Sequence, residues 1–117
     1  MAANTFDIII VGGGPGGYVT AIRSSQLGFR TCLVEKQHLG GICLNWGCIP
    51  TKALLRSAEI LNYLKRAADY GLRADGVDFD LEKIIQRSRS ISGQLNGGVK
   101  QLLKKNKVTV VMGHATL

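Results

Sequence analysis

Hydrophobic residues follow two different spacings along the chain, and the spacings predict alternating strands and helices. Continuous apolar runs, rich in β-branched residues, predict strands at residues 6–11, 31–34 and 108–112. Apolar residues three or four positions apart predict helices over residues 17–27 and about 50–70, and a long helix that begins after Asp80. The order strand, helix, strand, two helices, strand is typical of an α/β fold.

This order further indicates a doubly wound parallel sheet of the Rossmann-like type, in which the first strand is expected to be buried. The first helix offers an inner face of small residues, and Gly28 is expected to end it. We expect that inner face to comprise Val19, Ala21, Ile22 and Ser25.

The last helix has a long apolar stripe that is interrupted by glycines. Each of Gly93, Gly97 and Gly98 costs roughly 1 kcal/mol relative to alanine, so these glycines indicate close packing against a neighbour or a kink. The stripe comprises Leu81, Ile84, Ile85, Ile91, Leu95, Val99, Leu102 and Leu103.

Composition limits the class of protein. The 117 residues are 45% hydrophobic and 20% charged, which is typical of one globular domain. No apolar run reaches the roughly 18 residues of a membrane span, and the N-terminus lacks the features of a signal peptide, so we expect a cytoplasmic protein. The net charge of +7 is concentrated around Lys100–Lys107. Nucleic-acid binding is one interpretation, but a solvated helix face is favoured because no aromatic residues lie between these lysines.

Three cysteines are too few for a secreted disulfide framework, and two of them, Cys43 and Cys48, form a close pair. Zinc sites typically use two-residue spacing and four ligands, whereas four residues separate this pair. Cys32 lies inside a predicted strand and is expected to be a buried core residue, while His38 and His114 fit no ligand pattern. A redox-active disulfide between Cys43 and Cys48 is therefore favoured over a metal site or a purely structural disulfide.

A glycine-rich loop follows the first predicted strand. Gly12, Gly14 and Gly17 match the G-x-G-x-x-G pattern between a strand and a helix, where glycines permit a tight turn and close approach of a pyrophosphate. Glu35 ends the second strand about 20 positions later, where an acid accepts hydrogen bonds from an adenosine ribose. This combination predicts a dinucleotide site.

The surroundings of the cysteine pair are suited to a flat cofactor. Glycines beside each cysteine allow close approach of the backbone, and the helix expected from Pro50 places its positive end next to Cys48, which lowers a thiol pKa. Lys52 lies four residues after Cys48 and is expected to point the same way. For Trp46, shaping the dithiol entrance and packing on the neighbouring helix are equally supported.

The segment Gly40-Gly41-Ile42-Cys43-Leu44-Asn45-Trp46-Gly47-Cys48-Ile49-Pro50-Thr51-Lys52 resembles the active site of the pyridine nucleotide–disulfide oxidoreductases. Within that family the sequence of this segment is most similar to that of dihydrolipoamide dehydrogenase. The resemblance extends from the glycine loop to Gly113-His114-Ala115. It implies that residues 1–117 are the N-terminal part of an FAD-binding domain, with the NAD-binding and dimerisation domains outside them.

The resemblance also implies roles for individual residues. Cys43 would exchange with the substrate dithiol, Cys48 would lie over the flavin as a charge-transfer thiolate, and Lys52 would sit near the flavin nitrogen that passes the hydride. FAD itself would be bound by Gly12, Gly14, Pro15, Gly16, Gly17, Glu35, Lys36, Gly40, Gly41, Ile42, Cys43, Cys48, Lys52 and, through its backbone, Ala115.

The implied reaction oxidises dihydrolipoamide with NAD⁺ through FAD. The implied partner is the lipoyl domain of a 2-oxoacid dehydrogenase complex, and the full-length protein is expected to be a homodimer. The family's NAD-binding fingerprint and its C-terminal acid–base histidine are not among residues 1–117. We therefore expect residues 1–117 to be inactive on their own. A glutathione- or mercuric-type reductase and a non-catalytic nucleotide-binding segment are the alternatives.

Overall fold

The computed structural model, which describes residues 5–117, contains one parallel sheet of three strands. Strands β1 (Ile8–Val11), β2 (Thr31–Glu35) and β3 (Thr109–Met112) lie in the order β1-β2-β3. Ile9 pairs with Cys32, which in turn pairs with Thr109. The predicted α/β class and parallel sheet are thereby confirmed, although the first strand is two residues shorter than expected.

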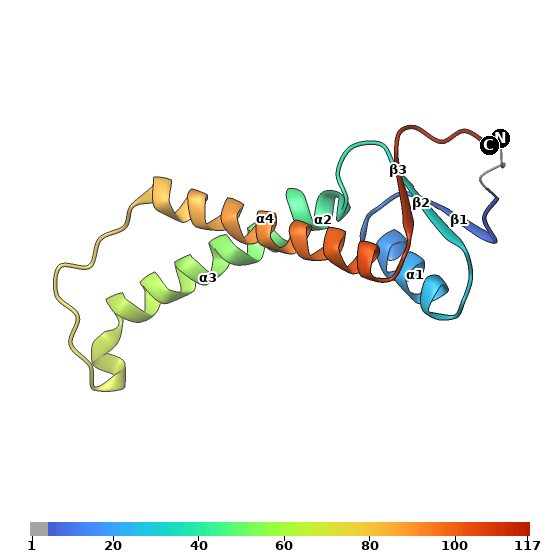
Figure 1. Cartoon of the computed structure of the whole chain (residues 1–117). Helices are drawn as coiled ribbons and strands as arrows, with labels where there is room; N and C mark the ends of the chain where they lie inside the picture. Colours follow the sequence, from blue (N-terminus) through green and yellow to red (C-terminus); the bar gives the residue numbers. More distant parts are fainter. Residues whose placement is uncertain (1–4) are drawn as a thin grey trace.

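Helix α1 (Pro15–Gln26) connects β1 to β2, and several helices separate β2 from β3. These are α2 (Gly41–Asn45), α3 (Cys48–Lys65), the short 3-10 helix η1 (Ala67–Tyr70) and α4 (Leu81–Lys105). Figure 1 shows α3 and α4 side by side, as an arm that extends from the sheet. The sequence did not predict α2, and the expected helix over residues 50–70 is displaced toward the N-terminus and ends at Lys65.

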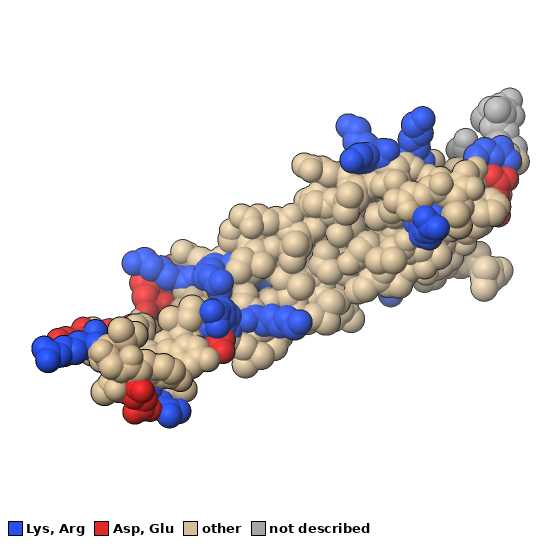
Figure 2. All heavy atoms as spheres, turned by 90° about the horizontal axis from the view of Figure 1, so that it is seen from below, with Lys and Arg blue, Asp and Glu red and all other residues tan. Residues whose placement is uncertain are grey.

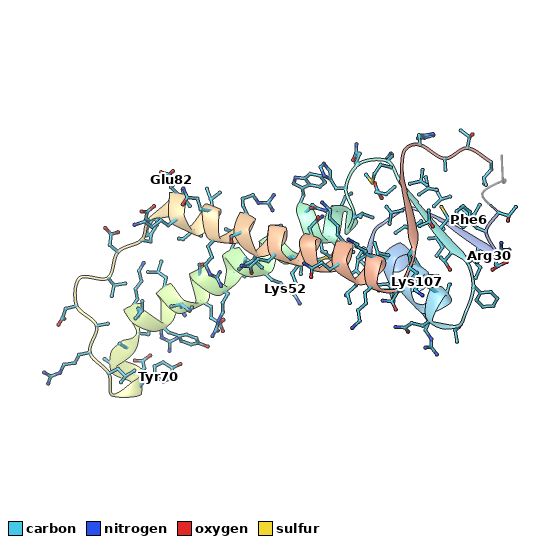
Figure 3. All side chains as sticks on the ribbon, viewed as in Figure 1. Phe6, Arg30, Lys52, Tyr70, Glu82 and Lys107 are labelled. Atoms are coloured by element: carbon cyan, nitrogen blue, oxygen red, sulfur yellow. A yellow bond between two sulfur atoms is a disulfide. The ribbon has the colours of Figure 1, made fainter. Side chains whose placement is uncertain are left out.

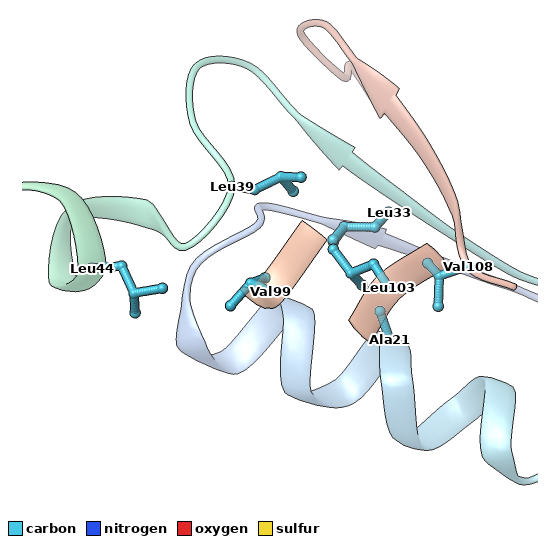
Figure 4. Close-up of a cluster of buried hydrophobic side chains, with 7 residues drawn as sticks. All are labelled: Ala21, Leu33, Leu39, Leu44, Val99, Leu103 and Val108. Carbon is cyan, nitrogen blue, oxygen red and sulfur yellow. The ribbon is translucent and has the colours of Figure 1, made fainter. Parts of the chain in front are cut away.

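The hydrophobic core lies on one face of the sheet, where α1 and the C-terminal half of α4 pack together against β2 (Figure 4). Its central side chains, Leu33 and Leu103, are completely buried. Ile10 and Val110 flank Leu33 in the sheet and pack on the same cluster. The cluster comprises Ala21, Leu33, Leu39, Leu44, Val99, Leu103 and Val108.

In the part of the chain that the structure describes, the opposite face of the sheet is exposed along β1 and β3, although Cys32 in the central strand is buried. Ile9 and Val11 each retain 60% of their surface, so the expectation that the first strand is buried was wrong for these two side chains. Successive strand residues point to opposite faces, and α1 and α4 pack on only one of them. In α1, Val19 is also exposed, and Ser24 is buried instead.

Helix α4 begins as the sequence predicted but buries fewer apolar side chains than its stripe indicated. Asp80 caps it by accepting a hydrogen bond from the Lys83 backbone N–H at 3.1 Å. Stripe residues near its start, such as Leu81 and Ile85, are exposed because the outer part of α4 packs on α3 around a hollow of about 650 Å³, and Leu95 farther along is exposed as well. In mid-helix, Ser88 and Ser92 are buried instead.

The glycines of α4 do not serve close packing. A Cβ atom built on Gly93, Gly97 or Gly98 would meet no atom within 4 Å, so that interpretation was wrong. The helix runs unbroken through all three positions.

Lysine and arginine side chains form separate groups along the molecular face in Figure 2 rather than one continuous patch. Lys104 and Lys105 lie in the last turn of α4, where the negative end of the helix dipole stabilises a positive charge. None of the helices within residues 5–117 is long and apolar enough to span a membrane.

Leu103→Ala is expected to destabilise the fold by about 2–5 kcal/mol, because truncation leaves a cavity between α4, α1 and the sheet. The neighbouring Leu102 is 48% exposed, and Leu102→Ala should cost less than about 1 kcal/mol. Denaturant unfolding of both variants measures the difference. Equal losses in the two variants would contradict this location of the core.

Candidate functional site

The glycine loop between β1 and α1 has a geometry that only glycine tolerates at two positions. Gly12 adopts a φ of +102°, in the region that residues with a side chain avoid. A Cβ atom on Gly17 would lie 1.7 Å from the Gly12 carbonyl oxygen. The first turn of α1 is thus held directly against the end of β1, as expected for the first and third glycines of a dinucleotide loop.

The start of α1 leaves its backbone donors free for a ligand. Gly14 is the N-cap and Pro15 the first helical residue, and neither a capping side chain nor an acidic residue occupies the first turn. The unpaired N–H groups and the positive end of the helix dipole therefore face outward together. This arrangement fits a pyrophosphate group.

The cysteine segment packs directly against this loop. A Cβ atom on Gly41 would lie 2.8 Å from Cα of Gly14, and Gly41 itself has a φ of +61°. The Gly40 N–H donates to the Gly13 carbonyl at 2.8 Å. The backbones of the two motifs, distant in the sequence, are thus in direct contact.

Glu35 connects the loop to the second strand. Its side chain is only 9% exposed, and its carboxylate accepts hydrogen bonds from the backbone N–H groups of Gly13 and Gln37, both at 2.7 Å. Burial raises the pKa of Glu35, but these and further backbone hydrogen bonds outweigh it and hold the pKa below its ordinary range. The carboxylate is therefore ionised at neutral pH.

A hollow of about 240 Å³ opens at the carboxyl ends of all three strands. Gly12, Glu35, Lys36 and Ala115, all predicted cofactor residues, contribute to its lining. The Gly113 N–H donates to the Glu35 carbonyl at 2.8 Å, which fixes the segment after β3 beside the glycine loop. The hollow is lined by Val11, Gly12, Val34, Glu35, Lys36, Gly113, His114 and Ala115.

Sequence reasoning did not identify His114, Val11 or Val34 as site residues. The signal that was available is the parallel sheet itself, because residues that follow neighbouring parallel strands meet at one edge. Pro15, Gly16 and Ile42, by contrast, are exposed and do not line this hollow. Their predicted cofactor contacts stay predictions.

Cys43 and Cys48 form a disulfide, as the sequence predicted, with their Cα atoms 4.6 Å apart. Cys43 lies in α2, whereas Cys48 is the first residue of α3, so the expected helix start at Pro50 was two residues too late. Gly47 permits this junction, since a Cβ atom there would lie 3.1 Å from the Ile42 carbonyl oxygen.

The sulfur atoms have different surroundings. Cys43 is half-buried, whereas Cys48 is exposed in the first turn of α3, which contains no acidic residue. The positive end of the α3 dipole therefore favours a thiolate at Cys48. Lys52 lies one helical turn later on the same side, with an exposed side chain (Figure 3).

Cys32 and Trp46 belong to neither the hollow nor the disulfide, and the two roles considered for Trp46 stay predictions. Cys32 is a free cysteine, 3% exposed in the central strand, and burial raises the pKa of its thiol, which confirms it as a core residue. The Trp46 ring contacts the edge of His38, with centroids 4.9 Å apart and planes at 76°. Within residues 5–117, no three His, Cys, Asp or Glu side chains lie close enough to hold a metal ion.

A disulfide at a helix start, beside a dinucleotide loop, agrees with the comparison to protein families. The model of the pyridine nucleotide-disulphide oxidoreductase family matches residues 6–117. The chain belongs to this family.

Two curated relatives have the same name. A dihydrolipoyl dehydrogenase of Zymomonas mobilis is 60% identical over 111 residues, which cover 95% of this chain and 24% of that protein. A dihydrolipoyl dehydrogenase of Rhizobium etli is 56% identical over 116 residues, again 24% of its length. The chain thus spans about a quarter of the length of the curated relatives it matches.

A solved structure supports the fold. The HOCl-induced flavoprotein disulfide reductase RclA from Escherichia coli, described as a Cu(II) complex, superimposes with a TM-score of 0.75 at 26% identity. The match covers 95% of this chain and 22% of that one. Membership of this family implies FAD and a pyridine nucleotide as cofactors, and the open cradle at Gly12, the free donors of α1 and the ionised Glu35 fit the dinucleotide part of FAD.

Gly17→Ala is expected to destabilise the fold by about 3 kcal/mol or more, because its methyl group would overlap the Gly12 carbonyl oxygen. Gly16→Ala is the matched control. A Cβ atom at Gly16 meets nothing within 4 Å, and alanine there should stabilise α1 by up to about 1 kcal/mol. Thermal unfolding of both variants distinguishes these effects, and a Gly17→Ala variant as stable as Gly16→Ala would refute the geometry.

Glu35→Gln should destabilise the chain at pH 7 by about 1–3 kcal/mol, because an amide cannot accept from both backbone donors. The pKa of Glu35 in the folded chain lies below the ordinary 4.5, so its stabilising contribution is present above that pH. The contribution is lost as pH falls through the folded-state pKa. Unfolding at a series of pH values should show the difference from wild type shrinking in acid, whereas Glu59→Gln, at an exposed carboxylate of the arm, should change stability much less.

Proposed function

We propose that residues 1–117 are the N-terminal part of the FAD-binding domain of a dihydrolipoyl dehydrogenase, which oxidises dihydrolipoamide to lipoamide and reduces NAD⁺ to NADH. The observation that carries the proposal is the Cys43–Cys48 disulfide at the start of α3, in a segment whose Gly41 packs on Gly14 of the dinucleotide loop. The name of the relatives at 60% and 56% identity supports this substrate. The NAD-binding and dimerisation domains would lie outside these residues.

The residues assigned to FAD divide between its two ends. Gly12, Gly14 and Gly17, with the N-terminus of α1, would hold the pyrophosphate, and Glu35, Lys36 and Ala115 would hold the adenosine. Gly40, Gly41, Cys48 and Lys52 would face the flavin. When bound, FAD supplies the ability to accept two electrons from a dithiol and to deliver them to NAD⁺ as a hydride.

The two cysteines would have distinct roles in thiol–disulfide exchange. A thiolate of dihydrolipoamide attacks the sulfur of Cys43 and forms a mixed disulfide, while Cys48 leaves as a thiolate. The second substrate thiol, after losing its proton, attacks the substrate sulfur of the mixed disulfide, which releases lipoamide and leaves Cys43 as a thiolate. The protein disulfide thereby gains the two electrons that the substrate loses. The N-terminus of α3 and Lys52 stabilise the negative charge on Cys48.

Other members of the family catalyse related chemistry, and a glutathione- or mercuric-type reductase is the nearest alternative. The segment around the cysteines and the names of the relatives favour the lipoamide enzyme. The proposal includes the lipoyl domain of a 2-oxoacid dehydrogenase complex as partner and a homodimer at full length. It also includes a cytoplasmic location, where disulfides are usually transient and catalytic.

In the full-length protein, Cys43→Ser and Cys48→Ser should each lower dihydrolipoamide-dependent NADH formation by more than about a hundredfold, since neither variant forms the disulfide. Oxidation of NADH by ferricyanide needs only the flavin and should persist. Cys32→Ala is the control, because Cys32 is a core residue away from the disulfide. Full activity in either serine variant would contradict the redox role, and turnover of oxidised glutathione in place of lipoamide would contradict the substrate.

A further inference from the structure

Polar side chains of α4 donate hydrogen bonds to backbone carbonyls throughout the cysteine segment. Three of the donors lie on one turn of the helix, at residues 87–89, and the fourth lies two turns later. Their acceptors lie between Leu39 and Ala53, on both sides of the disulfide. An apolar stripe would have been the ordinary way to pack α4 on α2 and α3. The donors are Arg87, Ser88, Arg89 and Asn96.

Asn96 binds Asn45, one of the residues between the two cysteines. Its amide Nδ2 donates to Oδ1 of Asn45 at 3.2 Å and also to the Leu39 carbonyl. Asn45 in turn donates from its own Nδ2 to the carbonyls of Leu39 at 3.1 Å and Gly41 at 2.8 Å. The two amides therefore close a network around α2, which carries Cys43.

Arg89 holds the other end of α2. Its Nη2 donates to the Asn45 carbonyl at 2.6 Å, at the C-terminus of α2, where carbonyl groups lack partners within the helix. The same nitrogen donates to Oγ of Ser92 at 3.2 Å, and Ser92 is buried. Ser92 of the same helix thus fixes the Arg89 guanidinium, which binds the backbone between the cysteines.

Two further donors hold the beginning of α3. Ser88 Oγ donates to the Pro50 carbonyl at 3.2 Å, and Arg87 Nη1 donates to the Ala53 carbonyl at 3.0 Å. Because Cys48 is the first residue of α3, these contacts set its position relative to α4. Helix α4 therefore contacts both α2, which contains Cys43, and α3, which contains Cys48.

Helix α2 needs such support when the disulfide is open. It has only five residues, and helices shorter than about 12 residues are marginal in water without tertiary contacts. Glycines stand on both sides of it, at Gly40 and Gly47. Once the Cys43–Cys48 bond is reduced, the hydrogen bonds from α4 add to the burial of Leu44 and to the Gly40–Gly13 hydrogen bond in keeping the thiols close together.

We propose that Asn96 and Arg89 are positioning residues for the redox cycle, which keep α2 in place so that the open dithiol can close again. The inference rests on the redox role proposed above. Closure removes two protons and two electrons from the thiols and passes the electrons to an oxidant, which is the flavin in the enzyme and oxidised dithiothreitol in the test below. Without the contacts, closure must first order α2, and the equilibrium shifts toward the dithiol.

The test measures the dithiol–disulfide equilibrium in the full-length protein. Wild type and Asn96→Leu are equilibrated without oxygen in mixtures of reduced and oxidised dithiothreitol, quenched in acid and alkylated. Peptide mass spectrometry then gives the fraction of Cys43 and Cys48 that is free. Asn96→Leu should shift the midpoint about 3- to 10-fold toward the dithiol, whereas Asn96→Gln, which keeps an amide donor, should recover most of the shift.

Asn106→Leu is the matched control, because Asn106 ends the same helix but its amide donates only to Leu102, away from the cysteines. Should Asn96→Leu fail to fold, Arg89→Met tests the same contact at an exposed side chain and should shift the midpoint in the same direction. A midpoint within twofold of wild type, or an equal shift in Asn106→Leu, would overturn the inference. A wild-type protein in which Cys43 and Cys48 never pair would instead overturn the redox role itself.

Discussion

The site depends on the direct contact between two stretches of backbone, one in the glycine loop and one at the start of the cysteine segment. Gly14 and Gly41 approach so closely that a methyl group on Gly41 would collide with the loop, and the hydrogen bond from Gly40 to Gly13 joins the same two stretches. A cofactor that lies on the loop is thereby close to the disulfide as well. The approach of Gly41 to Gly14 is possible because neither residue has a side chain.

Charge reinforces the same arrangement from the other side of the loop. The Glu35 carboxylate accepts a hydrogen bond from the N–H of Gly13, and the carbonyl of Gly13 accepts one from Gly40, so a single residue connects β2 to the cysteine segment. The starts of α1 and α3 carry no carboxylate that would neutralise them. The protein thus has two helix N-termini available for negative charge, one for phosphate and one for a thiolate.

Much of this was predictable from residues whose spacing has a direct physical meaning. The parallel sheet, the glycine loop, Glu35 at the end of β2, the cap at Asp80 and the cysteine pair all rest on local patterns, and the structure agrees with each. The errors in predicted burial arose where tertiary packing decides which side chains are covered. Ile9 and Val11 look like core residues in the sequence, but within residues 5–117 no helix covers them. In α4 the buried Ser88 and Ser92 were not predicted, because polar residues at an interface become favourable only when carbonyl acceptors lie opposite.

The long separation between β2 and β3 has a consequence for how the chain folds. Strands β1 and β2 are joined through one helix, so they pair across a short loop, whereas residues 36–108 separate β2 from β3. Loop closure over such a length has a larger entropic cost and slows folding. When α3 and α4 pack side by side, the arm brings the end of its second helix back to the sheet (Figure 1). Pairing of α3 with α4 thereby shortens the effective loop that must close before β3 joins the sheet. For the same reason, changes of length at the tip of the arm, in residues 71–79, affect the sheet little.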